Sequence, residues 1–243
     1  MKNSRDGLLK REEEVLRIIE LFSENNLKFV VVGGYAVSTY KKRFSVDLDI
    51  VVLKEDFSKF ENLLLKEEYS ICYGKEISLL HGEDFKRFVK KIDALPVNVD
   101  FLINGLVSRT TDSTWSFELI YKNSAKGELE GIEFLAPIRE LLIAMKMHSG
   151  RLSDTRDIIA LMPCDKNKLK EFLLRGDLKK LKFSIKKQAL FLEKPQFDDS
   201  FKGIFGPYSF NEKDVQSAKE MIKNLLEDKL QKRNFAYIKQ KKI

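Results

Sequence analysis

The chain has 243 residues, of which 43% are hydrophobic, and its 44 basic and 37 acidic residues give a net charge of +7. No apolar run approaches the roughly 18 residues of a membrane span, and the charged run at residues 10–14 stands where a secretory signal would be apolar. Two cysteines are too few for a disulfide scaffold, so we expect a cytoplasmic globular protein of one large or two small domains, with no membrane partner.

The first half of the chain predicts alternating helices and strands. Apolar spacing predicts a helix over 8–22, then a buried strand over 28–32 that stops at Gly33 and Gly34, with a helix beginning at the second glycine. A further strand is expected over 46–53 and a helix over 56–69. The pattern from 70 to 92 is ambiguous. Strands are expected over 97–103 and 131–136.

The second half predicts helices alone. Pro137 suits the first turn of a helix that runs to residue 149, and Ser153 or Asp154 would cap another that ends before Pro163. From residue 165 onward the chain reads as helical, interrupted at Pro195, Gly203, Gly206 and Pro207. Within it, residues 178–192 form an apolar stripe that leaves five lysines around the remaining surface: Lys179, Lys180, Lys182, Lys186 and Lys187.

Charge is divided unevenly along the chain. Residues 1–164 hold 24 basic and 26 acidic residues (net −2), whereas residues 165–243 hold 20 basic and 11 acidic residues (net +9). A basic helical region fits a polyanionic partner, because lysine and arginine displace counterions from a phosphate backbone. A lysine-rich solvated surface explains the same charge equally well.

Three aspartates are expected on two strands of the same sheet. Asp47 and Asp49 are two residues apart, so their side chains leave the same face of the strand. Asp100 lies in a later strand. Close carboxylates repel one another unless a cation neutralises them, and hard oxygen ligands favour Mg²⁺. The Gly33–Gly34 turn lets the backbone approach a phosphate. Each feature alone also fits a tight turn or a solvated strand end; together they predict a triphosphate and a metal between the turn and the second strand.

These residues carry a family resemblance. Val32-Gly33-Gly34, then Asp47-Leu48-Asp49-Ile50 and a later strand acid, resemble the DNA polymerase beta-like nucleotidyltransferase superfamily. Residues 137–148 and 151–158 resemble the helix pair of the AbiEii-like abortive-infection toxins, and the likeness covers about residues 29–162. It implies an α+β nucleotidyltransferase fold, a small mixed sheet flanked by helices, followed by a helical C-terminal region. The implied domains are a catalytic one over 1–136 and a helical one over 137–243, basic from 165.

The resemblance also implies roles for individual residues. Asp47 and Asp49 would bind Mg²⁺, with Mn²⁺ as the alternative, and Asp100 would complete a second metal position and help to deprotonate the acceptor hydroxyl. Lys146 would steady the phosphates as a point charge. Asp154 and Asp157, three apart on one helix face, could orient Lys146 or Arg43, and for both a structural ion pair and a direct substrate contact are equal alternatives. Nucleotide binding would then involve Gly33, Gly34, Arg43, Ser45 and Asp157.

The function expected from this reasoning is Mg²⁺-dependent transfer of a nucleoside monophosphate from an NTP to an acceptor. The resemblance implies the toxin half of a toxin-antitoxin pair, with tRNA or other RNA as acceptor and a cognate antitoxin as partner. Alternative functions are nucleotidylation of a protein, modification of a small molecule such as an aminoglycoside, and a non-catalytic binding module that retains the fold.

Overall fold

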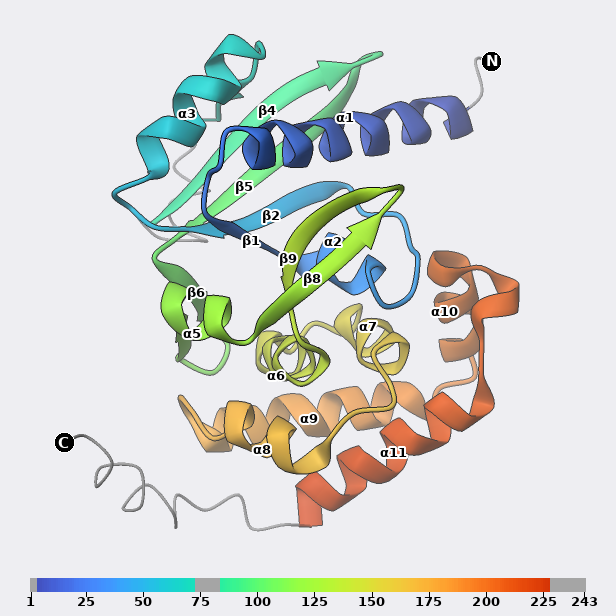
Figure 1. The fold of residues 1–243 in the computed structure, drawn as a ribbon. Coiled ribbons are helices and arrows are strands. Elements are labelled where there is room, and N and C mark those ends of the chain that lie inside the picture. Colours follow the sequence, from blue (N-terminus) through green and yellow to red (C-terminus); the bar gives the residue numbers. More distant parts are fainter. Residues whose placement is uncertain (1–3, 73–83, 228–243) are drawn as a thin grey trace, which may run out of the picture.

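A five-stranded mixed sheet lies at the centre of the computed structural model, which describes residues 4–72 and 84–227 (Figure 1). Its order is β1-β2-β5-β4-β3, in which β2 and β5 run parallel and the other neighbours run antiparallel. The strands are β1 (Phe29–Val32), β2 (Asp47–Val52), β3 (Ser70–Ile71), β4 (Phe85–Ile92) and β5 (Leu95–Ile103). Two antiparallel hairpins stand beside this sheet: β6 (Gly105–Ser108) with β7 (Ser113–Ser116), and β8 (Ser124–Leu129) with β9 (Ile132–Pro137).

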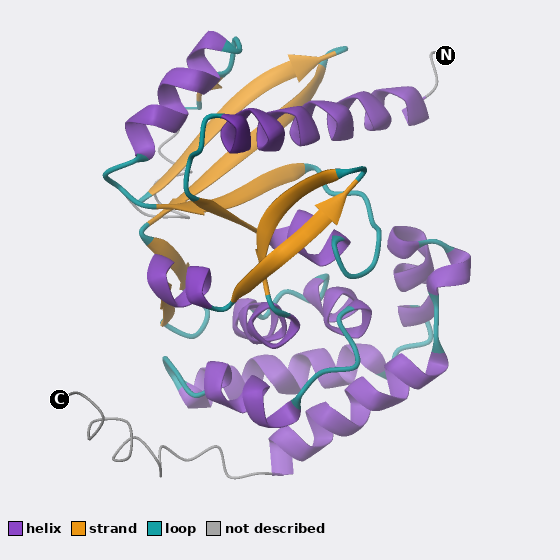
Figure 2. Cartoon of the chain, in the orientation of Figure 1, coloured by secondary structure: helices purple, strands orange, loops and turns teal. Residues whose placement is uncertain are grey.

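Helices surround the sheet and make up all regular structure described after β9, as Figure 2 shows by colour. Those in the first part are α1 (Ser4–Glu24), α2 (Gly33–Ser38), α3 (Phe57–Lys66) and α5 (Phe117–Lys122). Those that follow β9 are α6 (Arg139–Ser149), α7 (Asp154–Ala160), α8 (Lys166–Leu173), α9 (Leu178–Leu192), α10 (Phe197–Phe205), the 3-10 turn η1 (Pro207–Ser209) and α11 (Glu212–Glu227).

One face of the sheet is covered by α1 and α3 through an aromatic core. Phe22 of α1 lies 5.0 Å from Phe60 of α3 between ring centres, and Phe60 lies 5.7 Å from Phe101 of β5. Full burial of each such side chain stabilises the fold by about 1.5–3 kcal/mol. Because side chains alternate along a strand, Phe101 on this face places its neighbour Asp100 on the other.

The opposite face of the sheet is turned toward the later helices. Figure 1 shows α6 and α7 between the sheet and the layer formed by α8, α9 and α11. The α9 helix is fixed to the back of α6 by two buried hydrogen bonds: Ser184 Oγ donates to the Met147 carbonyl (2.6 Å) and Gln188 Nε2 to the Lys146 carbonyl (3.1 Å). α6 and α9 are therefore parts of one packed unit.

The structure confirms the α+β class, with a small mixed sheet flanked by helices and a helical region after it. The division into two domains at residue 137 stays a prediction. Two details of the sequence reading are wrong. Pro137 closes β9 instead of opening a helix, because Ile138 is still extended (ψ 156°) and α6 begins at Arg139. Gly203 lies inside α10, where the buried phenylalanines of the helix hold it in place.

The ambiguous stretch from 70 to 92 contains β3 and the eight-residue strand β4. The rest of that stretch, residues 73–83, and residues 228–243 of the predicted helical region lie outside the described residues. In the part that the structure describes, no helix is both long enough and apolar enough to cross a bilayer.

Candidate active site

The structure brings the three predicted aspartates to neighbouring positions on one face of the sheet. The parallel register of β2 and β5 sets Asp49 opposite Asp100, and Asp47 opposite Asn98. Asn98 Nδ2 donates a hydrogen bond of 2.7 Å to Asp47 Oδ1. Asp100 is only 3% exposed, whereas Asp47 and Asp49 are half-buried. The register therefore produces an acidic patch that is open on the β2 side.

The Gly33–Gly34 turn lies directly against this patch. Gly33 has a left-handed φ of +65°, and a Cβ built on it would stand 2.0 Å from Asp49 Oδ2. A Cβ on Gly34 would stand 2.2 Å from Ser45 Oγ and 2.3 Å from Arg43 Nη2. Both positions are glycine because other side chains occupy the space that a Cβ would need. Gly33, Gly34, Arg43 and Ser45 thus lie together beside the acids.

The environment of Asp49 disfavours its charged form. Desolvation beneath the glycine turn, followed by repulsion from the Asp100 carboxylate, raises the pKa of Asp49 to about 7. Lys146 and Arg151 oppose this rise at longer range, and Asp47 adds to it. Near neutral pH this carboxyl group therefore holds a proton part of the time, unless a cation is placed beside it.

Asp100 is held by an arginine that the sequence reading did not single out. Arg87 of β4 stands opposite Asp100 in the antiparallel register. Its Nε donates to Asp100 Oδ1 at 2.7 Å and its Nη2 to Oδ2 at 2.5 Å, so the pair is bidentate. Both carboxylate oxygens of Asp100 are engaged, which sets this acid apart from Asp47 and Asp49.

Lys146 lies in a buried ion cluster with the two aspartates of α7. Lys146 is 6% exposed, and its Nζ is 3.0 Å from Asp154 Oδ1 and 2.7 Å from Asp157 Oδ2. These two carboxylates hold the pKa of Lys146 above its usual value despite its burial. Asp157 Oδ1 is also 3.5 Å from Arg43 Nη1, and Arg151 Nε is 2.9 Å from Asp154 Oδ2. Asp154 and Asp157 therefore form an ion-pair network with Lys146, Arg43 and Arg151. Contact of Lys146 with phosphates stays a prediction.

Cations in this region are distributed unequally among the acids. Arg43, Lys146, Arg87 and Arg151 all lie within ion-pair distance of Asp100, Asp154 or Asp157. Among the residues that the structure describes, neither Asp47 nor Asp49 has a cation at that distance. The two half-buried acids next to the glycine turn are consequently the acids of this region that no described ion pair neutralises, which suits them to bind a cationic ligand.

The donor set fits a metal that takes few ligands from the protein. Within residues 4–72 and 84–227, no three carboxylate, imidazole or thiol groups converge as a metal cage requires. Mg²⁺ is commonly held by one or two carboxylates and completes its shell with water and substrate phosphates. Asp47 and Asp49, adjacent on one strand face and open toward the glycine turn, fit that mode.

Sequence reasoning missed Arg87, Asn98 and Arg151 as members of the site. Arg87 and Asn98 face the acids only because of strand register, which no local pattern reveals. Arg151 did carry a signal, since it is the first residue of the second matched segment, residues 151–158, and stands three residues before Asp154. That spacing is compatible with the observed i,i+3 ion pair.

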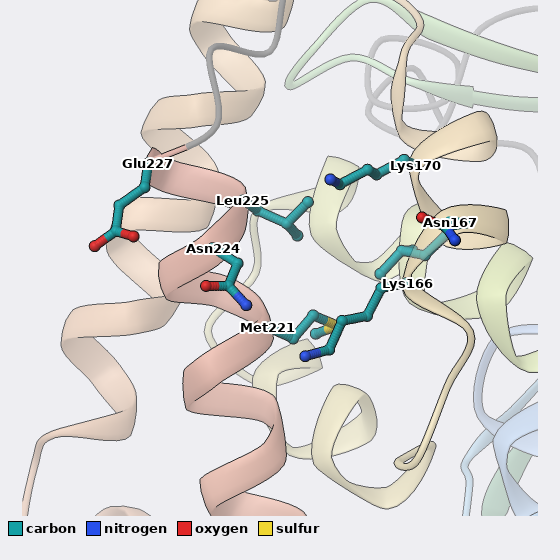
Figure 3. Close-up of a pocket in the computed structure, with 8 residues that line it drawn as sticks. Lys166, Asn167, Lys170, Met221, Asn224, Leu225 and Glu227 are labelled. Carbon is teal, nitrogen blue, oxygen red and sulfur yellow. The ribbon is translucent and has the colours of Figure 1, made fainter.

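A pocket of about 300 Å³ lies away from the acids, between α8 and α11 (Figure 3). Its polar lining comes from Lys166, Asn167 and Lys170 of α8 and from Asn224 and Glu227 of α11, and its apolar lining includes Met221 and Leu225. None of the predicted site residues lines it. The pocket belongs to the basic helical region and has no contact with the glycine turn.

The predicted lysine-rich helix coincides with α9. Its apolar stripe is buried at Leu181, Ile185 and Leu192, as expected. Lys179, Lys180, Lys186 and Lys187 are exposed and Lys182 is half-buried, but Lys180 Nζ is 2.6 Å from Asp112 Oδ2. Ser184 and Gln188 bind α9 to α6, and α6 and α7 lie between α9 and the sheet (Figure 1).

Comparison with known proteins yields structural likenesses alone. No protein-family profile and no curated protein sequence matches the chain. Among solved structures, lincomycin-bound lincosamide antibiotic adenylyltransferase LnuA is 17% identical, with 62% of this chain and 95% of that chain covered and a TM-score of 0.45. An antigenic nucleotidyltransferase-like protein from Paracoccidioides brasiliensis is 14% identical, with coverages of 79% and 92% and a TM-score of 0.47. A provisionally assigned nucleotidyltransferase from H. pylori is 13% identical, with coverages of 90% and 94% and a TM-score of 0.48.

Proposed function

We propose that this chain is a Mg²⁺-dependent nucleotidyltransferase that transfers a nucleoside monophosphate from an NTP to an acceptor and releases pyrophosphate. The observation that carries the proposal is the pair Asp47 and Asp49: two half-buried acids on one strand face, without an ion pair in the described part of the chain, against a glycine turn. The raised pKa of Asp49 supports it, because an adjacent cation would relieve the repulsion that causes the rise.

Asp47 and Asp49 would hold the Mg²⁺ ion, which when bound would neutralise charge on the triphosphate. The backbone of Gly33 and Gly34 would lie beside the phosphates, next to the Asp49, Ser45 and Arg43 side chains that pack on the two glycines. Ser45 and Arg43, which pack on Gly34, would add a hydroxyl and a guanidinium at the same place. Arg43 Nε is buried and has no hydrogen-bond partner within the described ranges, so this side chain retains a donor for a ligand.

Lys146 and Asp157 would act on the site through Arg43. Asp157 lies within ion-pair distance of both cations, 3.5 Å from Arg43 Nη1 and 2.7 Å from Lys146 Nζ. A guanidinium fixed by a buried carboxylate keeps its direction when substrate arrives, which reduces the entropy lost on binding. We therefore propose a positioning role for Asp157 and Lys146, with any direct phosphate contact by Lys146 requiring that it leave Asp154.

RNA, in particular tRNA, is the acceptor that we propose. The exposed lysines of α9 and the net charge of +9 after residue 164 support a polyanionic acceptor. The resemblance of residues 137–158 to the AbiEii-like helix pair supports a toxin role with a cognate antitoxin. A protein acceptor, a small-molecule acceptor and a binding module without activity are the competing functions.

One assay separates these functions. Each of the four α-labelled NTPs is offered with Mg²⁺ and three acceptors in separate tubes: total tRNA, cell protein, and a set of aminoglycosides and lincosamides. Label in RNA together with released pyrophosphate supports the proposal. Label in protein or in an antibiotic would support a nucleotidyltransferase that uses that acceptor in place of RNA. NTP binding without label in any fraction indicates the binding module.

A further inference from the structure

Arg87 and Asp100 form a preorganised ion pair within the acidic patch. Arg87 donates from Nε (2.7 Å) and Nη2 (2.5 Å) to the two oxygens of Asp100, and adjacent antiparallel strands hold the two residues in register. The carboxylate is 3% exposed, so little water competes for these bonds. A planar guanidinium matches a carboxylate in this geometry better than a lysine ammonium does.

The Arg87 guanidinium interacts electrostatically with more than one acid of the patch. Asp100 contributes most to the raised pKa of Arg87, and Asp47 and Asp49 contribute as well. A fixed positive charge thus stands within electrostatic range of all three acids that the sequence pattern groups together. An additional divalent cation on Asp100 would be repelled by this charge and would have to displace two charge-assisted hydrogen bonds.

We propose that Arg87 supplies the permanent positive charge beside Asp100, so that the site takes one divalent cation, on Asp47 and Asp49, and not two. This inference rests on the proposed function, because it concerns the number of metal ions in that same site. It changes the part assigned to Asp100 by resemblance: Asp100 becomes the anchor of Arg87 and a positioning residue, and is not a metal ligand.

Counting bound Mn²⁺ tests the inference without an activity measurement. Mn²⁺ is titrated into the purified full chain and followed by electron paramagnetic resonance, first alone and then with an α,β-methylene analogue of each NTP. We expect one bound Mn²⁺ per wild-type chain, and still one in Asp100→Asn. Arg87→Gln should bind two, because the variant lacks both the positive charge that repels a second cation and the two charge-assisted hydrogen bonds to Asp100.

Matched variants keep the count interpretable. Arg17 makes a similar bidentate pair with Glu14 on α1, at 2.9 Å for both bonds, so Arg17→Gln should leave the count at one. The double variant Arg87→Gln/Asp100→Asn removes both partners and should also bind one. If Arg87→Gln does not fold, the wild-type, Asp100→Asn and double-variant counts still decide the question.

The outcomes that overturn the inference differ from those that overturn the proposed function. Two Mn²⁺ in the wild type, a lost ion in Asp100→Asn, or a count that stays at one in folded Arg87→Gln would each contradict the role of Arg87 and leave a metal site at Asp47 and Asp49. No bound Mn²⁺ in any protein, with or without nucleotide, would contradict the metal site itself and with it both proposals.

Discussion

The carboxylate of Asp49 lies so close to the backbone of Gly33 that a Cβ on residue 33 would stand 2.0 Å from Oδ2 and 2.9 Å from Cγ. Val32, the last residue of β1, pairs with Asp49 across the sheet, and the left-handed turn at Gly33 carries the chain over that carboxylate into α2. The backbone conformation of the turn and the position of the Asp49 carboxylate therefore depend on each other, and a substitution at either residue should displace the other.

Replacement of Gly33 by alanine should displace Asp49 and weaken Mn²⁺ binding at least tenfold. The left-handed backbone alone costs roughly 1–2 kcal/mol for a residue with a Cβ, and the contact with Asp49 adds to it. Gly131→Ala is the matched control: its φ is +84°, but a Cβ there meets nothing within 4 Å. That variant should show the backbone cost in urea unfolding and bind Mn²⁺ normally. Equal metal affinities in the two variants would contradict the contact.

Asp49→Asn should remove a pH dependence of stability in metal-free buffer. Folding raises the pKa of this carboxyl from 3.8 to about 7, so the folded chain keeps a proton that the unfolded chain loses. The stabilisation from that proton is complete below about pH 4 and is lost as pH rises toward 7 and above. Each pKa unit corresponds to about 1.4 kcal/mol, which makes the expected loss a few kcal/mol.

The measurement is urea unfolding with a chelator at pH 5 and pH 8. The free energy of unfolding of Asp49→Asn relative to that of the wild type should be higher at pH 8 than at pH 5. Glu133→Gln alters an exposed ion pair with Lys126, and its free energy of unfolding should differ from that of the wild type by the same amount at both pH values. A parallel response of wild type and Asp49→Asn across the range would mean that the Asp49 carboxyl titrates normally.

Lys146→Met should lower the free energy of unfolding by about 3–5 kcal/mol, because it leaves Asp154 and Asp157 buried without their shared cation. Lys126→Met, at an exposed pair, is the control and should change stability little. Urea unfolding and NTP affinity are measured on the same preparations. Unchanged stability combined with a large loss of NTP affinity would instead place Lys146 at the phosphates.

Exchange of Lys179, Lys186 and Lys187 for glutamine should weaken RNA binding about equally for different sequences. Each lost contact with a single-stranded backbone should lower the log–log salt slope by ~0.7. Lys180 is left in place because it pairs with Asp112. A charge-matched control replaces three exposed lysines of the first part of the chain: Lys54, Lys66 and Lys122. RNA binding that is unchanged at low and high salt would favour a solvated face or an acidic protein partner.

The sequence predicts best the elements that have a strong local pattern. The run Val30-Val31-Val32 before two glycines identifies β1, and the apolar stripe over residues 178–192 coincides with the bounds of α9. The placement of Asp47 and Asp49 on one face follows from the two-residue period of a strand. Each of these conclusions depends on residues close together in the chain.

Features that depend on register or packing were not predictable in the same way. β4 carries Lys86, Arg87, Lys90 and Lys91, so its apolar alternation is weak and the strand was missed. The pairing of Arg87 with Asp100 follows from antiparallel register across 13 residues of chain. Spacing placed Asp154 and Asp157 on one helix face, but only the packing of α7 against α6 brings them to Lys146.

The most direct test of nucleotidyl transfer at Asp47 and Asp49 uses four proteins: wild type, Asp47→Asn, Asp49→Asn and the surface control Glu133→Gln. Each is incubated with Mg²⁺, α-labelled NTP and tRNA, and both labelled RNA and pyrophosphate are measured over time. The account predicts transfer by the wild type and the control, and a loss of at least a hundredfold in both aspartate variants, with their thermal unfolding unchanged or shifted upward. Full transfer by either aspartate variant would contradict it.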